Sequence, residues 1–376
     1  MRIIMISGLD ANHFYGSSTR PYYLNRSLSA SGAKVLHICP EPPREGIANT
    51  SFVRVGTRSK LKVVIVCNIL ARSCLFHADV LYVHQSGWMK ALGIRLSHLL
   101  SKPVVLDMHG SVTQELEESG LSEPSRIKNA EEMDKRALAA ADKIIVVSLE
   151  LKQFLQTRFA VPAERLVLVP NGVDLSSYGS SIAEQEIDSM RALLGIQRGN
   201  RIVTFTCPRI ERFMSNEIAL KWFFEAVKIL DSRRNDLTVL ILGGGKIITP
   251  PSSSVLYSGF VENLPCALAL SDVCVLPYPP NAVCGGVRNK ALEYFAAGKP
   301  VVSTTEGIRG IQEAAAGRDY LLADNSEDFA QRIVDAISDE TLALKIGSNG
   351  LALAKHYEWA VLGQKVYDTL LLATRK

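Results

Sequence analysis

Short apolar runs rich in β-branched residues alternate with helix-length segments along all 376 residues, and this alternation restricts the possible folds more than any other feature. The runs form two series. The first comprises 2–6, 34–38, 80–83, 104–107, 143–147 and 166–169, and the second 202–206, 237–242, 255–258, 273–276 and 300–302. Strands that read as continuous apolar runs are buried on both faces, which is typical of parallel sheets covered by helices. The pattern therefore predicts an α/β chain with two Rossmann-like, doubly wound domains.

The polar stretch 176–185 is the best candidate for the boundary between these domains. We expect a first domain over 1–178, a second over 179–355, and a helix over 356–376 that crosses back to the first. Ligands of such sheets bind beyond the carboxyl ends of the strands, so we expect an active site in a central cleft that the two sheets face.

The composition is that of a soluble protein, with 47% hydrophobic residues and seven cysteines at irregular spacing. No apolar run approaches the roughly 18 residues that span a bilayer, and the N-terminus has a strand pattern and not that of a signal peptide. Irregularly spaced cysteines indicate reduced thiols. We therefore expect a cytoplasmic protein.

The segment 51–102 carries eight basic residues and one acid, Asp79, although the whole chain has a net charge of only +4. Two interpretations remain open: contact with an anionic membrane surface or acceptor, and a solvated face without a partner. Nucleic acid is not expected as a partner, because too few aromatic residues are interspersed to stack bases.

Three loops follow predicted strands and carry polar or glycine residues. The first contains Gly16 and Ser17 and leads into a helix, where backbone N–H groups can meet a phosphate. The second places His109 at a strand end, where an imidazole can donate to a sugar hydroxyl or assist proton movement. The third, Pro170-Asn171-Gly172-Val173-Asp174, stops its strand in a tight turn.

This third string resembles the "PNGVD" signature of the family 4 retaining glycosyltransferases ("glycosyl transferases group 1"). Further segments resemble the family in the same order: Ser148 after its strand, the glycine turn 240–245, the pair of segments 259–261 and 270–273, and 290–302, which is very similar to "K.lEyma.GkPVv". The resemblance covers almost the whole chain.

The resemblance implies the GT-B fold, with the sugar nucleotide held mainly by the second domain. It implies that Glu293 binds the ribose hydroxyls and that His109 lies near the donor sugar and the leaving phosphate. The other residues that it places at the donor are Gly16, Ser17, Gly243, Gly244, Val261, Gly285 and Gly286.

Two departures from the family pattern concern charge. Gly285 stands where the family often has the first glutamate of E-x7-E, and no lysine follows Arg209 at the usual place. We expect Arg209 to act in catalysis and Lys290, Arg288 or Arg212 to supply the missing cation, because the leaving nucleotide diphosphate gains charge in the transition state.

No D-x-D motif occurs, so neither a metal nor another cofactor is expected. The resulting hypothesis is a metal-independent hexosyltransferase that transfers sugar with retention from a nucleotide-diphosphate sugar. The acceptor would be a glycan or lipid-linked hydroxyl in polysaccharide biosynthesis, with the enzyme peripheral at the inner face of the membrane. Alternatives on the same fold are a sugar-nucleotide 2-epimerase, a phosphorylase-like enzyme and a catalytically silent scaffold or binding subunit.

Overall fold

The computed structural model divides the chain into two compact units. Unit 1 comprises Met1–Gly172 and Trp359–Lys376, and unit 2 comprises Val173–Glu358. The residues described are 1–10, 19–55, 77–84, 102–119, 123–178, 182–208, 214–245, 248–282 and 288–375. The chain passes between the units after residues 172 and 358, whereas the sequence analysis set the boundaries at 178 and 355.

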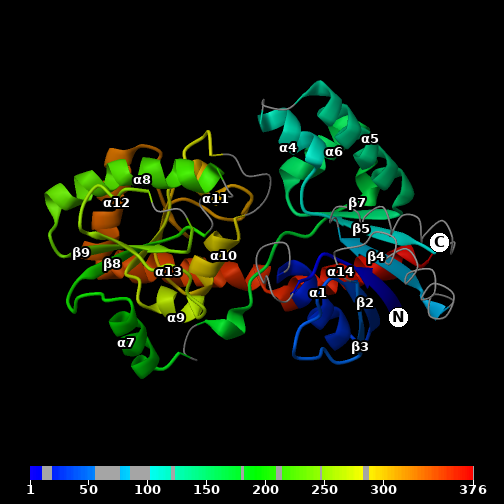
Figure 1. Ribbon diagram of the computed structural model, residues 1–376, viewed down its shortest axis with the longest axis horizontal. Coiled ribbons are helices and arrows are strands. Elements are labelled where there is room, and N and C mark those ends of the chain that lie inside the picture. The colour runs from blue at the N-terminus through cyan, green and yellow to red at the C-terminus, as the bar shows by residue number, and fades with distance from the viewer. Residues whose placement is uncertain are drawn as a thin grey trace. The chain divides into compact units, whose positions relative to one another are not determined.

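The described part of unit 1 is built on a seven-stranded parallel sheet in the order β3-β2-β1-β4-β5-β6-β7 (Figure 1). The strands are β1 (Arg2–Ile6), β2 (Lys34–Cys39), β3 (Thr50–Arg54), β4 (Val80–His84), β5 (Val104–Met108), β6 (Lys143–Val146) and β7 (Leu166–Leu168). The helices are α1 (Thr19–Ala30), α4 (Val112–Ser119), α5 (Pro124–Ala140), α6 (Leu149–Phe159), the short η2 (Ala163–Arg165) and α14 (Trp359–Ala373).

Alternate residues of β1 enter two different cores, which explains why its whole apolar run is buried. Ile4 and Ile6 belong to one cluster with residues of α5 and α6, and Ile3 and Met5 to another with residues of α1 and α14. Each fully buried aliphatic side chain contributes about 1.5–3 kcal/mol, so helices on both faces are required.

Helix α14 completes unit 1 although the whole of unit 2 separates it from the rest of that unit in the sequence (Figure 1). It packs against α1, where a Cβ on Gly363 would lie 2.1 Å from the Cβ of Ser27. The hydroxyl of Ser27 donates to the carbonyl oxygen of Trp359 at 2.9 Å, and the Trp359 ring stacks on Tyr23. A residue without a side chain is thus needed where the two helices touch.

The described part of unit 2 contains a six-stranded parallel sheet in the order β10-β9-β8-β11-β12-β13. The strands are β8 (Arg201–Thr206), β9 (Leu237–Leu242), β10 (Val255–Tyr257), β11 (Val273–Leu276), β12 (Val301–Ser303) and β13 (Leu321–Leu322). The helices are η3 (Leu175–Ser177), α7 (Glu184–Leu193), α8 (Met214–Arg233), α9 (Leu264–Ala269), α10 (Asn289–Ala296), α11 (Thr305–Ile308), α12 (Ser326–Ser338), α13 (Glu340–Ala354) and η4 (Lys355–Tyr357).

The expected fold class, two Rossmann-like α/β units with parallel sheets, is confirmed. In each sheet the strand order reverses once, between β1 and β4 in unit 1 and between β8 and β11 in unit 2. At such a switch point the connections leave the sheet in opposite directions, so a crevice opens beyond the carboxyl ends of the strands, and ligands bind there.

Candidate active site

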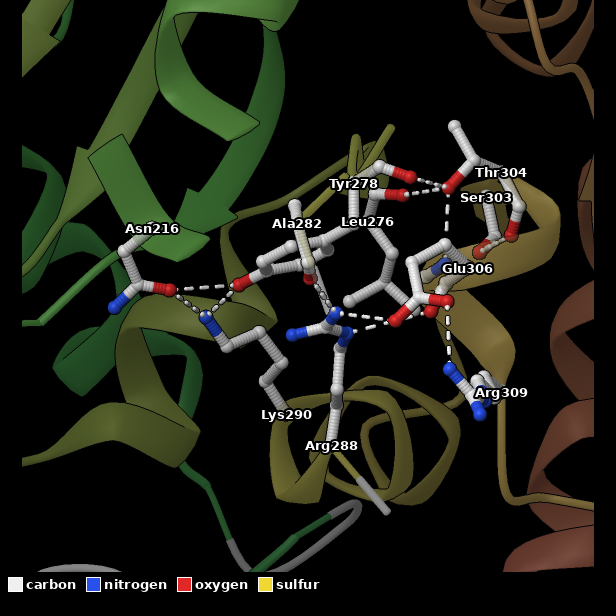
Figure 2. Close-up of polar contacts among 11 residues, drawn as sticks. Asn216, Leu276, Tyr278, Ala282, Arg288, Lys290, Ser303, Thr304, Glu306 and Arg309 are labelled. Carbon is white, nitrogen blue, oxygen red and sulfur yellow. Dashed lines mark hydrogen bonds and ion pairs between the residues drawn. The ribbon is translucent and has the colours of Figure 1, made fainter. Parts of the chain in front are cut away.

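Lys290 lies at the switch point of unit 2. It is the second residue of α10, and its Nζ donates to the carbonyl oxygen of Thr206 at 2.7 Å. It also donates to Oδ1 of Asn216 at 3.3 Å and to the hydroxyl of Tyr278 (Figure 2). Thr206 ends β8 and Tyr278 follows β11, so the ammonium group joins the two strands that flank the switch. The Tyr278 hydroxyl in turn donates to Asn216 Oδ1 at 2.8 Å. These contacts fix a positive charge where a ligand of a doubly wound sheet is expected.

Arg288 is placed differently, although it precedes Lys290 by only two residues (Figure 2). Its guanidinium donates to Oε1 of Glu306 at 3.0 Å and to the carbonyl oxygen of Ala282 at 2.6 Å, and it lies 3.6 Å from the centre of the Tyr278 ring. Both charged side chains are almost fully buried. Because the Glu306 carboxylate already offsets this charge, Lys290 is the stronger of the two described candidates for an anionic ligand.

Glu293 lies one helical turn beyond Lys290, on the same face of α10. The side chain is partly buried, and no hydrogen-bond partner for its carboxylate is found among the described residues. Burial raises the pKa of this carboxyl, and the nearby Lys290 charge offsets only part of that rise. A desolvated carboxylate without protein donors is suited to accept from a ligand.

The glycine turn after β9 brings a second segment to the same edge of the sheet. Gly243 has φ of +140°, and a Cβ there would lie 2.6 Å from the carbonyl oxygen of Cys207. Its N–H donates to the Gly259 carbonyl oxygen at 3.0 Å. The structure thus requires glycine at 243, whereas a Cβ on Gly244 would meet only ordinary contacts. Val261 is partly buried against the core of unit 2.

His109 lies at the corresponding edge of unit 1, directly after β5. Its Nε2 is 3.6 Å from Oδ1 of Asp107 and 3.4 Å from Nδ1 of His84. Burial lowers the pKa of His109 to about 4, against the opposing effect of the Asp107 charge. The imidazole is therefore neutral near pH 7. Its Nε2 faces Asp107 and His84, and no partner for Nδ1 is found among the described residues.

Burial raises the pKa of Asp107, but the guanidinium of Arg20, together with His84, His109 and the Tyr82 hydroxyl, outweighs burial and lowers this pKa to about 2. Arg20 Nε lies 3.1 Å from each carboxylate oxygen, and the Tyr82 hydroxyl also donates to Asp107. Ligand atoms of His84, Asp107 and His109 lie within 4.8 Å of one another. The adjacent Arg20 charge opposes a cation in this buried position, so we assign these residues to no metal.

Six of the predicted site residues lie outside the described residues: Gly16, Ser17, Arg209, Arg212, Gly285 and Gly286. Most of the basic segment 51–102 does as well. Conversely, the sequence did not point to four residues that are parts of these sites: Arg20, His84, Asn216 and Tyr278. The only available signal was position, because each lies at a strand end or in the first turn of a helix.

Two Rossmann-like α/β units with parallel sheets are the architecture of the GT-B fold. Two family models match the chain: "Glycosyltransferase Family 4" over residues 15–177 and "Glycosyl transferases group 1" over residues 202–339. The chain belongs to this family of glycosyltransferases.

Individual relatives are distant. An uncharacterised glycosyltransferase of Methanocaldococcus jannaschii is 22% identical over 78% of this chain and 75% of that protein. The D-inositol 3-phosphate glycosyltransferase of Nocardia farcinica is 24% identical over 60% of this chain and 52% of that protein. The crystal structure of Anabaena HepE with UDP and glucose superposes with a TM-score of 0.73 at 17% identity, covering 99% of this chain and 100% of that one. This likeness shows the shared fold.

In the described part of the chain, none of the helices combines the length and the apolar character that crossing a membrane requires.

Proposed function

We propose that this protein is a metal-independent, retaining glycosyltransferase that takes its sugar from a nucleotide-diphosphate donor. The observation that carries the proposal is the pair formed by Lys290 and Glu293 on one face of α10, at the switch point of unit 2. A fixed cation suits a diphosphate, and a carboxylate that has no donor among the described residues suits the two ribose hydroxyls.

The leaving nucleotide diphosphate gains negative charge as the glycosidic bond to the donor breaks. Lys290 would stabilise that charge, which supports departure without a metal ion. The neutral His109 would accept or donate at a donor hydroxyl through Nδ1. The bound UDP and glucose of the HepE structure make a UDP-sugar the first donor to test.

For the acceptor we propose the hydroxyl of a glycan or of a lipid-linked sugar, and for the location the cytoplasm, at the inner face of the membrane. The basic excess of the segment 51–102 supports an anionic acceptor or lipid surface. Hexosyl transfer in polysaccharide assembly fits these chemistries.

Isothermal calorimetry with UDP-, GDP-, ADP- and TDP-sugars in the presence of EDTA tests the donor proposal. One nucleotide family should bind, and Glu293→Ala should weaken it about tenfold to a hundredfold, since a hydrogen bond to a charged group contributes about 1.5–3 kcal/mol. Glu225→Ala, on the exposed face of α8, is the matched control and should bind like wild type.

The alternatives give other results. A silent subunit would bind none of the nucleotides or would bind without turnover, and an epimerase would convert the donor without an acceptor. Loss of binding on addition of EDTA would refute metal independence. Equal affinities of Glu293→Ala and wild type would refute the assignment of the ribose site.

A further inference from the structure

One buried guanidinium holds together three segments at the carboxyl edge of the sheet in unit 1. Arg20 is the second residue of α1 and is 1% exposed. Its Nη1 donates to the carbonyl oxygen of Pro170 at 2.7 Å and to Oδ1 of Asn171 at 3.4 Å, and its Nη2 donates to the carbonyl oxygen of Val169 at 3.0 Å. With the two Nε contacts to Asp107, every nitrogen of the guanidinium is engaged.

Arg20 follows the loop that contains Gly16 and Ser17, where the sequence predicts a phosphate. Its own guanidinium is not directed to such a ligand. The Arg20 side chain is buried against the ends of β5 and β7 instead, where it pairs with Asp107 and donates to backbone carbonyl oxygens.

The histidine at this edge is surrounded by a small number of titratable groups. Asp107 and His84 face His109 directly, and Arg20 and Tyr82 lie behind Asp107. Nε2 of His84 is buried and has no hydrogen-bond partner among the described residues.

Farther along the sheet, His37 of β2 is held by hydrogen bonds to the Ser7 hydroxyl and to the Asn25 side chain. Burial lowers the pKa of both His84 and His37, so these two imidazoles are neutral near pH 7. Among the described residues, Arg20 and Asp107 are therefore the charged groups that affect the pKa of His109.

We propose that Arg20 is a positioning residue for His109: by clamping Asp107 and the turn at 169–171, it fixes the ring and keeps it unprotonated. The catalytic meaning of this role rests on the proposed function, because it presumes that His109 meets the donor sugar. The clamp itself does not depend on the donor.

Removing the Arg20 charge should change the pKa of His109 in a definite direction. In Arg20→Met the Asp107 carboxylate is left next to His109 without its counter-charge, so the pKa of His109 should rise by about 1–2 pH units. In Arg20→Met/Asp107→Asn both charges are absent, and the midpoint should return close to that of wild type. In Asp107→Asn the unmatched arginine should move it lower still.

The test is an NMR titration of the histidine rings in the ligand-free full chain. The His109 signal is assigned by its loss in His109→Gln, and folding of each variant is checked by circular dichroism. An upward shift in Arg20→Met that the double variant reverses supports the proposal. An unchanged midpoint in folded Arg20→Met, or the same shift in the double variant, would overturn it.

If Arg20→Met does not fold, Arg20→Gln, which also removes the charge but keeps hydrogen-bond donors, takes its place: an upward shift of the midpoint that Arg20→Gln/Asp107→Asn reverses supports the clamp, and an unchanged midpoint refutes it. The pH profile of kcat/KM with UDP-glucose adds the catalytic readout, since its acid limb should shift with the His109 midpoint. Absence of turnover with UDP-glucose in wild type would count against the donor proposal and leave the NMR result intact.

Discussion

Removing one partner of the buried ion pair between Arg288 and Glu306 should destabilise unit 2 far more than removing one partner of an exposed pair in the described part of the chain. The side chains of the buried pair are only 5% and 10% exposed. Replacing Arg288 by Met removes a charge-assisted hydrogen bond to Glu306, the contact to the Ala282 carbonyl oxygen and the cation–π contact with Tyr278. Breaking one partner of a buried pair costs about 3–5 kcal/mol.

The lower end of this range is expected for Arg288→Met, because Arg309 remains 3.4 Å from the Glu306 carboxylate. Glu306→Gln should cost more, since it leaves the Arg288 cation buried without a counter-charge. In the double variant Arg288→Met/Glu306→Gln neither the Arg288 cation nor the Glu306 carboxylate remains. The cycle should therefore give a coupling energy of about 2–3 kcal/mol.

Urea unfolding followed by circular dichroism and fluorescence measures these differences, with m values compared between variants. The exposed pair Glu225–Lys228, at 2.8 Å, is the control and should couple by less than about 1 kcal/mol. A coupling at Arg288–Glu306 no larger than in this control would refute the reasoning, because burial would then add nothing to the pair.

Three further predictions follow from single contacts. Gly363→Ala should lower the free energy of unfolding of unit 1 by about 1–3 kcal/mol in urea unfolding, and adding Ser27→Gly should recover part of this loss. Gly46→Ala, with open space around it, is the control and should be neutral. Equal unfolding midpoints for all these variants would contradict the close approach of α1 and α14. Glu293→Gln should raise the thermal midpoint at pH 7, because the raised pKa of the Glu293 carboxyl means that its ionised form destabilises the folded state. This gain in midpoint should shrink as the pH falls through that pKa. A gain that is the same at every pH between 4 and 8 would show that ionisation of Glu293 is not the cause. Lys290→Met should weaken UDP binding about tenfold or more in calorimetry, and an unchanged affinity would show that the diphosphate does not meet this cation.

The alternation of apolar runs was sufficient to predict both sheets, because strands buried on both faces leave an unmistakable apolar pattern. This pattern did not predict two of the edge strands. β13 has only two residues, and β3 is partly exposed along its length, so neither shows a continuous apolar run.

Among the site residues, Lys290 and Glu293 could be proposed from the resemblance, and their roles at the donor stay predictions. The sequence made Arg288 an equal candidate for the missing cation, yet in the structure it pairs with Glu306, eighteen residues away. Composition cannot reveal whether a cation is buried against a carboxylate or turned to a ligand, since that depends on contacts between distant segments. The same holds for Arg20, which pairs with Asp107.

Helix α14 imposes an order on how the newly made chain can mature. Leu362, Val366 and Leu370 belong to the core that also holds Ile3 and Met5 of the first strand. While the ribosome adds residues one by one, α1 alone of the two helices α1 and α14 can cover this face of the first sheet until the chain has been made through Glu358. Unit 2 can reach its native state earlier, because all of its residues precede α14. A nascent chain with an exposed apolar sheet is a substrate for chaperones, so we expect unit 1 to depend on them until residues 359–373 emerge.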